Sequence, residues 1–406
     1  MELSAEALES MERGAMRREL AERARLKYEG QSISGALYAD TKIVFGEEAI
    51  RKHIQDPDSG YFIKSPKTFL GADLRVQQIE LFSEIVTRLL AHIKNKAEHQ
   101  KKQEIENIVL GRPVNFHGTR GEDGNKQALN ILERSSIAAG FKNVEFMMEP
   151  IAAALDYEQC LSKDRVVLVL DAGGGTTDCS MMKVGPSYKN MTNRDSSVLG
   201  YAGDRIGGMN LDMKLAIRKI MPFFGKGSIR NNGLPMPSSI YCNAVAINDV
   251  NLQKQFSSTK TEREIKRFIA QSEEKNKINR LLTLQRGNLS YRLNRSAELA
   301  KIHLSDRDPI NLPLQYIEPE LYIPITRNDL KESIEQELNI FVSLMKEAQK
   351  QAGVSPDIIY VTGGTAKSPI VEEWIRSHFG NIDIVVGELF GSVTSGLTTW
   401  ARKVYQ

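Results

Sequence analysis

Cysteine and long apolar runs are both scarce in this sequence of 406 residues. The three cysteines, Cys160, Cys179 and Cys242, are too few and too widely spaced for a disulfide framework or a zinc site. No apolar run approaches the roughly 18 residues of a transmembrane helix, and the charged N-terminus lacks the apolar segment of a signal peptide. These absences predict a protein of the reducing cytoplasm that has no membrane partner.

The sequence also lacks a strong excess of either charge. Its formal net charge is only +3, and basic residues are scattered among acidic ones rather than gathered in runs, which argues against nucleic acid as a partner. The chain is 41% hydrophobic and long enough for two domains, each with its own core.

Strand and helix patterns alternate along the chain, which predicts an α/β fold. We expect strands at residues 108–110, 143–150, 165–170, 321–326, 357–364 and 382–387, and an extended segment at 61–71 that Pro66 interrupts. We expect helices at residues 2–27, 76–97, 127–139 and 327–352, and a mainly helical, charged insertion at 213–300.

The stretch VVLVLDAGGGTTD, residues 166–178, places three glycines directly after a strand. Such a turn leaves backbone N–H groups unobstructed and suits a phosphate. Asp171 and Asp178 can hold a hydrated Mg²⁺ through its water molecules, and Thr176 and Thr177 add hydroxyl groups. The spacing fits neither a P-loop nor a dinucleotide motif. A plain glycine turn with aspartate caps remains the alternative interpretation.

A second glycine pair, Gly363 and Gly364, ends the strand in YVTGGTAKSP, residues 360–369. Alone, this pair would indicate an ordinary turn before a helix that Pro369 helps to start. Together with the first loop, on the same kind of strand end, it indicates a second wall of a ligand site.

These motifs carry a family resemblance over essentially the whole chain. DAGGGTTD, MEPIAAALDY (148–157) and VTGGTAKSPIV (361–371) resemble the nucleotide-binding domain of the DnaK-type seventy-kilodalton heat-shock chaperones, within the actin-like ATPase superfamily. FIKSPKTFLG, GRPVNFHG, GGGTTDCS and DRIGG are closer still to the YegD-like chaperones.

The resemblance implies an actin-like, ribonuclease-H-like fold with two lobes around a nucleotide cleft. The first lobe would span residues 1–162, with a small subdomain at about 20–78. The second would span 163–406, with a helical insertion at about 213–304. The family's first phosphate loop, an Asp-x-Gly-Thr turn, has no counterpart here, so the first-lobe sheet is expected to be incomplete.

The resemblance also assigns the catalytic residues. Lys67 matches the lysine that reaches the transferring phosphate, with Lys64 as a rival. Glu149 matches a glutamate near the metal and the hydrolytic water, and Asp171 matches the aspartate that orients that water. Asp178 matches a second carboxylate of the metal shell.

ATP or ADP with Mg²⁺ would then contact residues from both glycine motifs and from one helix. The predicted set is Gly173, Gly174, Gly175, Thr176, Thr177, Gly207, Gly208, Glu298, Lys301, Ser305, Gly363, Gly364 and Lys367. One departure is Ile302, which stands where the family has an arginine that stacks on the base.

The two ends of the chain also depart from the family. We expect a start codon assigned too far downstream rather than a decayed gene, because Lys67, Glu149, Asp171 and Asp178 remain in place. The chain stops at TTWARKVYQ, about where the family's nucleotide-binding domain ends, which predicts no peptide-binding domain here.

The favoured hypothesis is an ATP-binding, ATP-hydrolysing, chaperone-like domain that lacks the half of the phosphate clamp that the missing loop forms in the family. Its partners would be nucleotide and, through another surface, unfolded proteins or co-chaperones. A sugar kinase or polyphosphatase on the same fold and a nonhydrolysing nucleotide sensor remain alternatives.

Overall fold

The computed structural model describes residues 43–56, 63, 66–116, 120–191, 194–365, 368–387 and 391–405. The helix predicted at residues 2–27 lies outside these ranges, as does most of the predicted small subdomain. Within the described ranges, no helix combines the length and the apolar character needed to cross a membrane.

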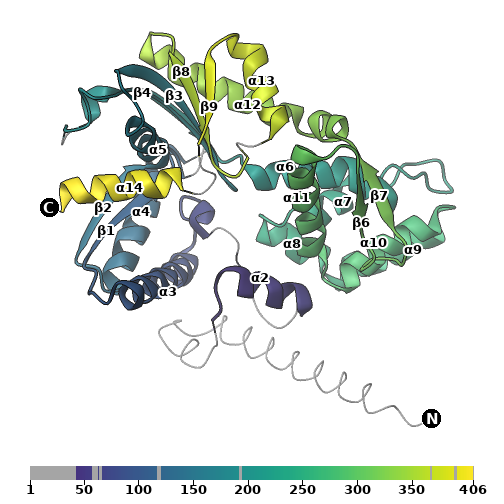
Figure 1. The fold of residues 1–406 in the computed structure, drawn as a ribbon. Helices are drawn as coiled ribbons and strands as arrows, with labels where there is room; N and C mark the ends of the chain where they lie inside the picture. Colours follow the sequence, from purple (N-terminus) through teal and green to yellow (C-terminus); the bar gives the residue numbers. More distant parts are fainter. Residues whose placement is uncertain are drawn as a thin grey trace.

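The largest sheet has five strands in the order β5-β4-β3-β8-β9 (Figure 1). Its strands are β3 (Arg165–Ala172), β4 (Thr177–Val184), β5 (Val198–Asp204), β8 (Ile358–Thr362) and β9 (Asp383–Val386). β3 pairs antiparallel with β4 and parallel with β8, so it lies at the centre of the sheet. The residues from Val167 to Leu170 are fully buried, as expected for a strand covered on both faces.

A second, parallel sheet consists of β1 (Asn107–Arg112) and β2 (Asn143–Met148) among the described residues. The helices α3 (Val76–Lys101) and α4 (Gly121–Ala138) pack on each other beside it. The order α3-β1-α4-β2 followed by α5 (Glu149–Glu158) repeats later in the chain, as α12 (Arg327–Ala352), β8, α13 (Pro369–Phe379), β9 and α14 (Ser392–Val404). Both α3 and α12 are 26 residues long. The expected incompleteness of the first-lobe sheet stays a prediction, because residues 1–42 lie outside the described part of the chain.

The helices α5 (Glu149–Glu158) and α14 (Ser392–Val404) pack closely between these two sheets (Figure 1). A Cβ atom on Gly396 would lie 1.8 Å from the carbonyl oxygen of Ala152, so only glycine permits this approach. Tyr157 of α5 stacks on Tyr360 of β8, with ring centroids 4.6 Å apart. α14 also contacts β1, so the last helix of the chain packs on the segment predicted as the first lobe.

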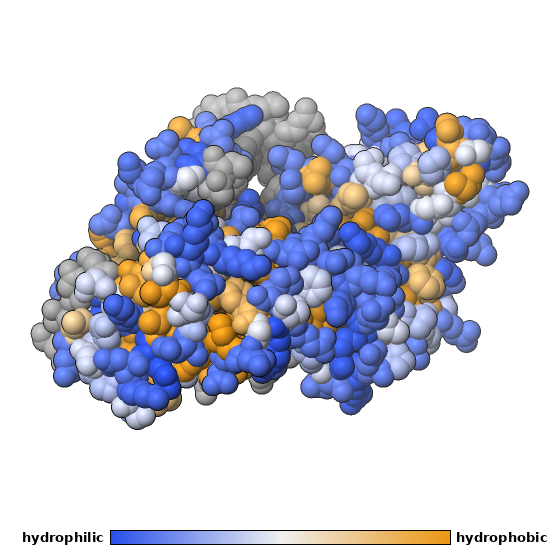
Figure 2. Space-filling model, turned by 90° about the horizontal axis from the view of Figure 1, so that it is seen from above, coloured by the Kyte–Doolittle hydropathy of each residue, from blue (hydrophilic) through white to orange (hydrophobic). Residues whose placement is uncertain are grey.

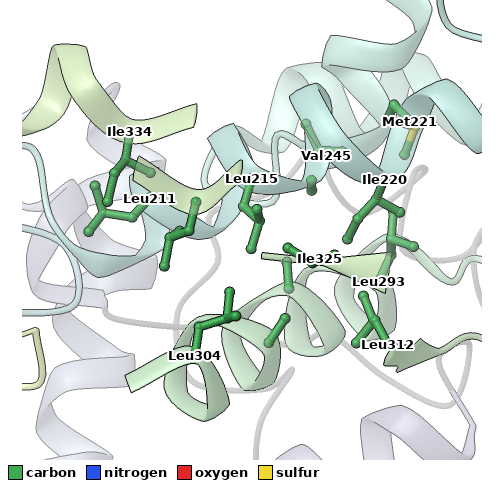
Figure 3. Close-up of a cluster of buried hydrophobic side chains, with 14 of the residues drawn as sticks. Leu211, Leu215, Ile220, Met221, Val245, Leu293, Leu304, Leu312, Ile325 and Ile334 are labelled. Atoms are coloured by element: carbon green, nitrogen blue, oxygen red, sulfur yellow. The ribbon is translucent and has the colours of Figure 1, made fainter. Parts of the chain in front are cut away.

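The remaining elements form a mainly helical group and the connections around it. They are α2 (Gly46–Gln55), η1 (Pro66–Phe69), η2 (Asp195–Ser197), α6 (Gly208–Leu215), η3 (Ala216–Ile220), η4 (Met221–Phe224), α7 (Ser238–Val245), α8 (Val250–Phe256), α9 (Thr259–Ala270), α10 (Lys275–Arg286), α11 (Ser290–Asp306), β6 (Ile310–Pro313), β7 (Tyr322–Ile325), α12 (Arg327–Ala352) and α13 (Pro369–Phe379). Figure 3 shows the core of this group, where Leu215 of α6, Leu293 of α11 and Ile325 of β7 converge.

Helix α12 has the bounds that the sequence predicts, because both of its ends are capped. At its start the hydroxyl of Thr326 accepts from the amide of Asp329 at 3.0 Å, and the Asp329 carboxylate accepts from the Thr326 amide at 2.9 Å. At its end Gly353 adopts a left-handed conformation with φ +66°.

Several predictions about local structure were wrong or incomplete. Residues 66–69 form a 3₁₀ turn rather than an extended segment, because Pro66 at the first helical position favours a helical start. Helix α4 begins at Gly121, not near Gln127, so part of the polar, glycine-rich stretch is helical. Three strands were not predicted: β4 and β5 of the large sheet, and β6, which pairs antiparallel with β7.

The surface in Figure 2 is mainly hydrophilic, with apolar side chains scattered over it. One charged pair is buried instead: Arg194 and Glu158 lie 2.8 Å apart, with side chains 4% and 0% exposed. The same carboxylate accepts from the amide of Gly185 at 3.1 Å. This pair therefore attaches the loop between β4 and β5 to α5.

Candidate functional site

Asp171 and Asp178 lie opposite each other at the end of the β3–β4 pair that the glycine loop closes, where their Cα atoms are ladder partners. Both side chains are buried, with 7% and 1% of their residue surfaces exposed. The backbone amide of Val114, from the segment after β1, donates to Asp178 Oδ1 at 2.7 Å. Among the described residues, Asp178 Oδ2 is buried and has no hydrogen-bond partner.

Burial makes both aspartates unusually difficult to ionise. Burial is the main cause that raises the pKa of Asp171 to about 7, with the nearby charge of Glu149 adding to the effect and Lys67 opposing it. Burial also raises the pKa of Asp178 well above its ordinary value, with Glu149 adding to the effect and the Val114 N–H opposing it. The ligand-free site is therefore electrostatically strained by its carboxylates.

This strain predicts a pH-dependent effect of the substitution Asp171→Asn on the ligand-free protein. In the folded protein Asp171 keeps its proton up to about pH 7, whereas in the unfolded chain it loses the proton near pH 3.8. The burial of Asp171 therefore destabilises the folded protein little at pH 4, increasingly up to pH 7, and by a constant amount above pH 7. Asparagine carries no charge and avoids this destabilisation. The difference in free energy of unfolding between the variant and the unmodified protein should therefore increase by about 2 to 3 kcal/mol, in favour of the variant, between pH 5 and pH 8.

Denaturant titrations at pH 5 and pH 8 would measure this gain. Asp383→Asn provides a matched control, because Asp383 is an exposed aspartate at the start of β9. A gain that is equal for the two variants, or one that shrinks with increasing pH, would contradict the burial argument.

A lysine and a glutamate from separate elements meet beside these aspartates. Lys67 lies in the 3₁₀ turn η1, and its ammonium group pairs with the carboxylate of Glu149, the first residue of α5. Gly111 near the end of β1 makes room for this pair, because a Cβ atom there would lie 3.0 Å from the Glu149 side chain. The structure thus brings together Lys67, Glu149, Asp171 and Asp178, as the sequence predicts.

The turn at Gly207 and Gly208 fixes the glycine loop that follows β3. The amides of Gly208 and Met209 donate to the carbonyl oxygens of Gly173 and Gly174 at 2.9 and 2.8 Å. A Cβ atom on Gly207 would lie 2.7 Å from Gly173 O, so the two segments touch through their backbones. The amide of Gly207 donates to Asn210 Oδ1 at 3.1 Å, so the amides of Gly207 and Gly208 are both occupied within the protein rather than presented to a ligand.

Two backbone amides of the glycine loop after β3, those of Gly174 and Gly175, remain accessible to a ligand. Gly174 is exposed, and among the described residues the amides of Gly174 and Gly175 have no acceptor. Thr176 is buried at 8% exposure, and the fully buried Thr177 donates from its hydroxyl to the Ile206 carbonyl oxygen at 2.6 Å. The amides of Gly174 and Gly175 are thus the ones that remain for a phosphate.

The second glycine motif packs against the strand that carries Asp171. Gly363 has φ +90°, and a Cβ atom there would lie 2.4 Å from Ala172 O and 2.9 Å from an Asp171 carboxylate oxygen. Gly364 beside it is exposed, and Thr365 is buried. Lys367 lies outside the described residues.

Helix α11 carries the predicted nucleoside contacts. Lys301 pairs with Asp212 at 2.7 Å and donates to Gly208 O at 3.2 Å, so this helix is attached to the glycine turn. Glu298 lies one turn earlier and pairs with Arg295 at 2.7 Å. Ser305 is half-buried near the end of the helix, and its carbonyl oxygen accepts from Arg327. Ile302 is 47% exposed.

The donor set fits a hydrated divalent cation. An unpaired, buried carboxylate oxygen of Asp178 lies in a site with two further carboxylates, Asp171 and Glu149, and one lysine. A cation would relieve the strain that raises the two aspartate pKa values. In the described ranges, no three His, Cys, Asp or Glu side chains form a direct metal-binding cluster. Mg²⁺ usually keeps several of its water molecules, which could bridge the ion to these carboxylates.

Sequence reasoning missed several neighbours of the site. Val114 supplies a backbone donor that no side-chain pattern reveals. Gly203 on β5 leaves space for Asp178, since a Cβ atom there would lie 2.3 Å from Asp178 Oδ1. Glycines at strand ends, such as Gly111 and Gly203, were the signal available in the sequence.

A comparison with known protein families identifies the family of this chain. The profile of the family described as "Hsp70 protein" matches residues 55–223 and 245–384, which include most of the site. The chain belongs to the Hsp70 family. This confirms the DnaK-type resemblance of the glycine motifs, whereas the closer likeness to the YegD-like chaperones stays a prediction.

Curated relatives within the Hsp70 family include the "Chaperone protein DnaK" of Thermotoga petrophila and that of Thermotoga maritima. Each is 28% identical over 371 residues, which cover 87% of this chain and 50% of the relative. The DnaK of Thermotoga neapolitana matches to the same extent. This Hsp70 family member therefore spans about half the length of the curated relatives it matches.

Proposed function

We propose that the chain binds ATP and ADP with Mg²⁺ and hydrolyses ATP to ADP and phosphate, as a chaperone-like nucleotide-binding domain. The observation that carries this proposal is the junction of three glycine segments, at Gly173–Gly175, Gly207–Gly208 and Gly363–Gly364, beside two buried aspartates, a lysine and a glutamate. Membership of the Hsp70 family supports it independently.

The phosphate groups would lie at the glycine loop after β3. The unoccupied amides of Gly174 and Gly175 suit anionic oxygens, and Thr176 adjoins them. Asp178 and Asp171 would hold Mg²⁺ through its water molecules. The bound ion would offset negative charge on the phosphates, which is the chemistry that this cation supplies in phosphoryl transfer.

Hydrolysis would use residues that the fold already places together. A water oriented by Asp171 and Glu149 attacks the γ-phosphorus, the bond to the bridging oxygen breaks, and ADP leaves. The proton of the water passes to Asp171, a buried carboxylate beside Glu149 at the glycine loop. Lys67 stabilises the charge that develops on the transferring phosphate.

The adenosine would lie between α11 and the second glycine motif. Glu298 and Lys301 would contact the ribose, Ser305 the edge of the base, and Gly364 the opposite wall, with Lys367 nearby in the sequence. Ile302 exposes an apolar side chain at the position that the family resemblance assigns to base stacking. An apolar contact would therefore replace a stacked guanidinium group.

The wider setting also belongs to the proposal. Two lobes, at residues 1–162 and 163–406, would enclose the nucleotide in an actin-like fold, and their closure would report its state. The names of the DnaK relatives support a chaperone role, with unfolded proteins or co-chaperones as partners in the cytoplasm.

Tracing the γ-phosphate of labelled ATP in single-turnover reactions tests this function. We expect the label to appear as inorganic phosphate, at the same rate with and without a panel of sugars. Transfer of the label to a sugar would instead indicate a kinase, and bound ATP that is never cleaved would indicate a nucleotide sensor. Either result would overturn the proposed hydrolysis.

A further inference from the structure

Arg205 connects the glycine turn to the element that carries Lys67. It lies between β5 and Gly207, and its guanidinium carbon is 5.4 Å from the centroid of the Phe69 ring in η1. Phe69 in turn stacks on Phe82 of α3, with centroids 5.5 Å apart and ring planes 14° from parallel. The cation thus caps a pair of stacked aromatic rings.

The η1 turn is held firmly at its far end. The side chain of Gln127 in α4 donates to the carbonyl oxygens of Leu70 and Ala72 at 2.7 and 2.9 Å, and Arg120 donates to Ala72 at 2.8 Å. Leu70 is fully buried. The front of the turn, with Lys67 and Phe69, instead contacts Glu149 and Arg205.

The surroundings of Arg205 favour packing of its guanidinium group on an aromatic ring over an ion pair. Its side chain is half-buried, and burial lowers its pKa from the ordinary arginine value, with only the distant charge of Asp249 opposing this. No carboxylate of the described residues pairs with its guanidinium group at ion-pair distance. The guanidinium group instead lies over the face of Phe69, so this contact holds the arginine and the turn together.

We propose that Arg205 is a positioning residue for Lys67, acting through a clamp formed by Arg205 and Phe69. The clamp ties the lysine-bearing turn to the glycine turn at Gly207, which itself fixes the phosphate loop. Lys67 and the loop then move together rather than independently. This inference rests on the proposed function of Lys67, although the clamp itself does not require turnover.

Hydrogen exchange of the ligand-free protein tests the clamp directly. The amides of Leu70 and Ala72 donate within the turn, to Lys67 O and Phe69 O at 3.3 and 3.0 Å. In Arg205→Leu we expect them to exchange about tenfold faster, the effect of losing one partly desolvated cation–π contact. In Phe69→Leu we expect exchange at least as fast, because this change also removes the stacking on Phe82. The double variant should be no faster than the faster single variant, because both changes remove the same contact.

Two further variants serve as controls for the exchange experiment, Arg205→Lys and Arg263→Leu. Lysine retains a cation and should restore most of the protection, whereas Arg263 is an exposed arginine on α9 whose loss should change nothing. Additive effects of the two single substitutions, or protection that is unchanged in Arg205→Leu, would overturn the clamp.

Kinetics then separate positioning from direct phosphate binding. We expect Arg205→Leu to lower kcat for ATP hydrolysis about tenfold with a Kd for ADP within about twofold of the unmodified protein, and Phe69→Leu to match it. A large loss of ADP affinity in Arg205→Leu alone would make Arg205 a phosphate ligand and overturn the positioning role. If the unmodified protein releases no phosphate, the proposed hydrolysis fails while the exchange result still decides on the clamp.

Discussion

Lys67→Ala is expected to lower the rate of ATP hydrolysis about 100- to 1000-fold while the affinity for ADP changes little, because this ammonium group acts on the transferring phosphate, which ADP lacks. Its loss also leaves the Glu149 charge uncompensated beside Asp171. Since Lys67 lowers the pKa of Asp171, the residual activity should require a higher pH than that of the unmodified protein. Single-turnover rates from pH 6 to pH 9 measure both effects.

Lys64→Ala is the matched control, because it removes the rival lysine three residues earlier in the same segment. It should leave the rate within about threefold, on the usual scale of substitutions outside a site. Equal losses in the two variants, or a Lys67→Ala variant that loses ADP affinity in parallel with its rate, would remove Lys67 from the transfer step.

Gly363→Ala is expected to destabilise the protein by about 4 kcal/mol, from left-handed strain together with overpacking against backbone. Its Cβ atom would meet Ala172 O at 2.4 Å and the Asp171 carboxylate at 2.9 Å. Because the shift would displace Asp171, nucleotide affinity should also fall on the order of 100-fold at temperatures where the variant stays folded. Denaturant titration and calorimetry measure the two effects.

Gly353→Ala is a control that has the backbone strain of a left-handed residue without the steric overlap. Gly353 also has a left-handed φ, +66°, but a Cβ atom there would meet nothing within 4 Å. Its substitution should therefore cost roughly 1 to 2 kcal/mol and leave nucleotide binding unchanged. If the two substitutions lowered the free energy of unfolding by similar amounts, the packing of Gly363 on Ala172 would not be what fixes the second glycine motif in the site.

The central strand β3 and the long helices were predictable because their signals are local, whereas β4, β5 and β6 were not predicted. The apolar run before Asp171 indicates a buried strand, and the capping pair of Thr326 and Asp329 fixes the start of α12. Helix α4 was misplaced because its first turn is polar and rich in glycine, so neighbouring contacts rather than propensity determine where it starts.

The candidate site was predictable in its parts but not in its connections. The glycine motifs identify Gly173, Gly207 and Gly363, but not that Gly208 and Met209 donate to the loop and leave fewer amides for phosphate. Contacts such as that of Val114 with Asp178, 64 residues apart, depend on how the sheets pack and leave no periodic trace. Arg205 and Phe69 likewise belong to distant segments.

A calorimetric titration of the folded chain with ATP and Mg²⁺ tests the central claim most directly. We predict saturable one-to-one binding with a Kd on the order of 1 µM, and its loss in Gly364→Trp, whose indole would fill the space at the exposed Gly364. Folded protein that gives no saturable heat, or a Gly364→Trp variant that binds as tightly as the unmodified chain, would contradict a nucleotide site at these glycine segments.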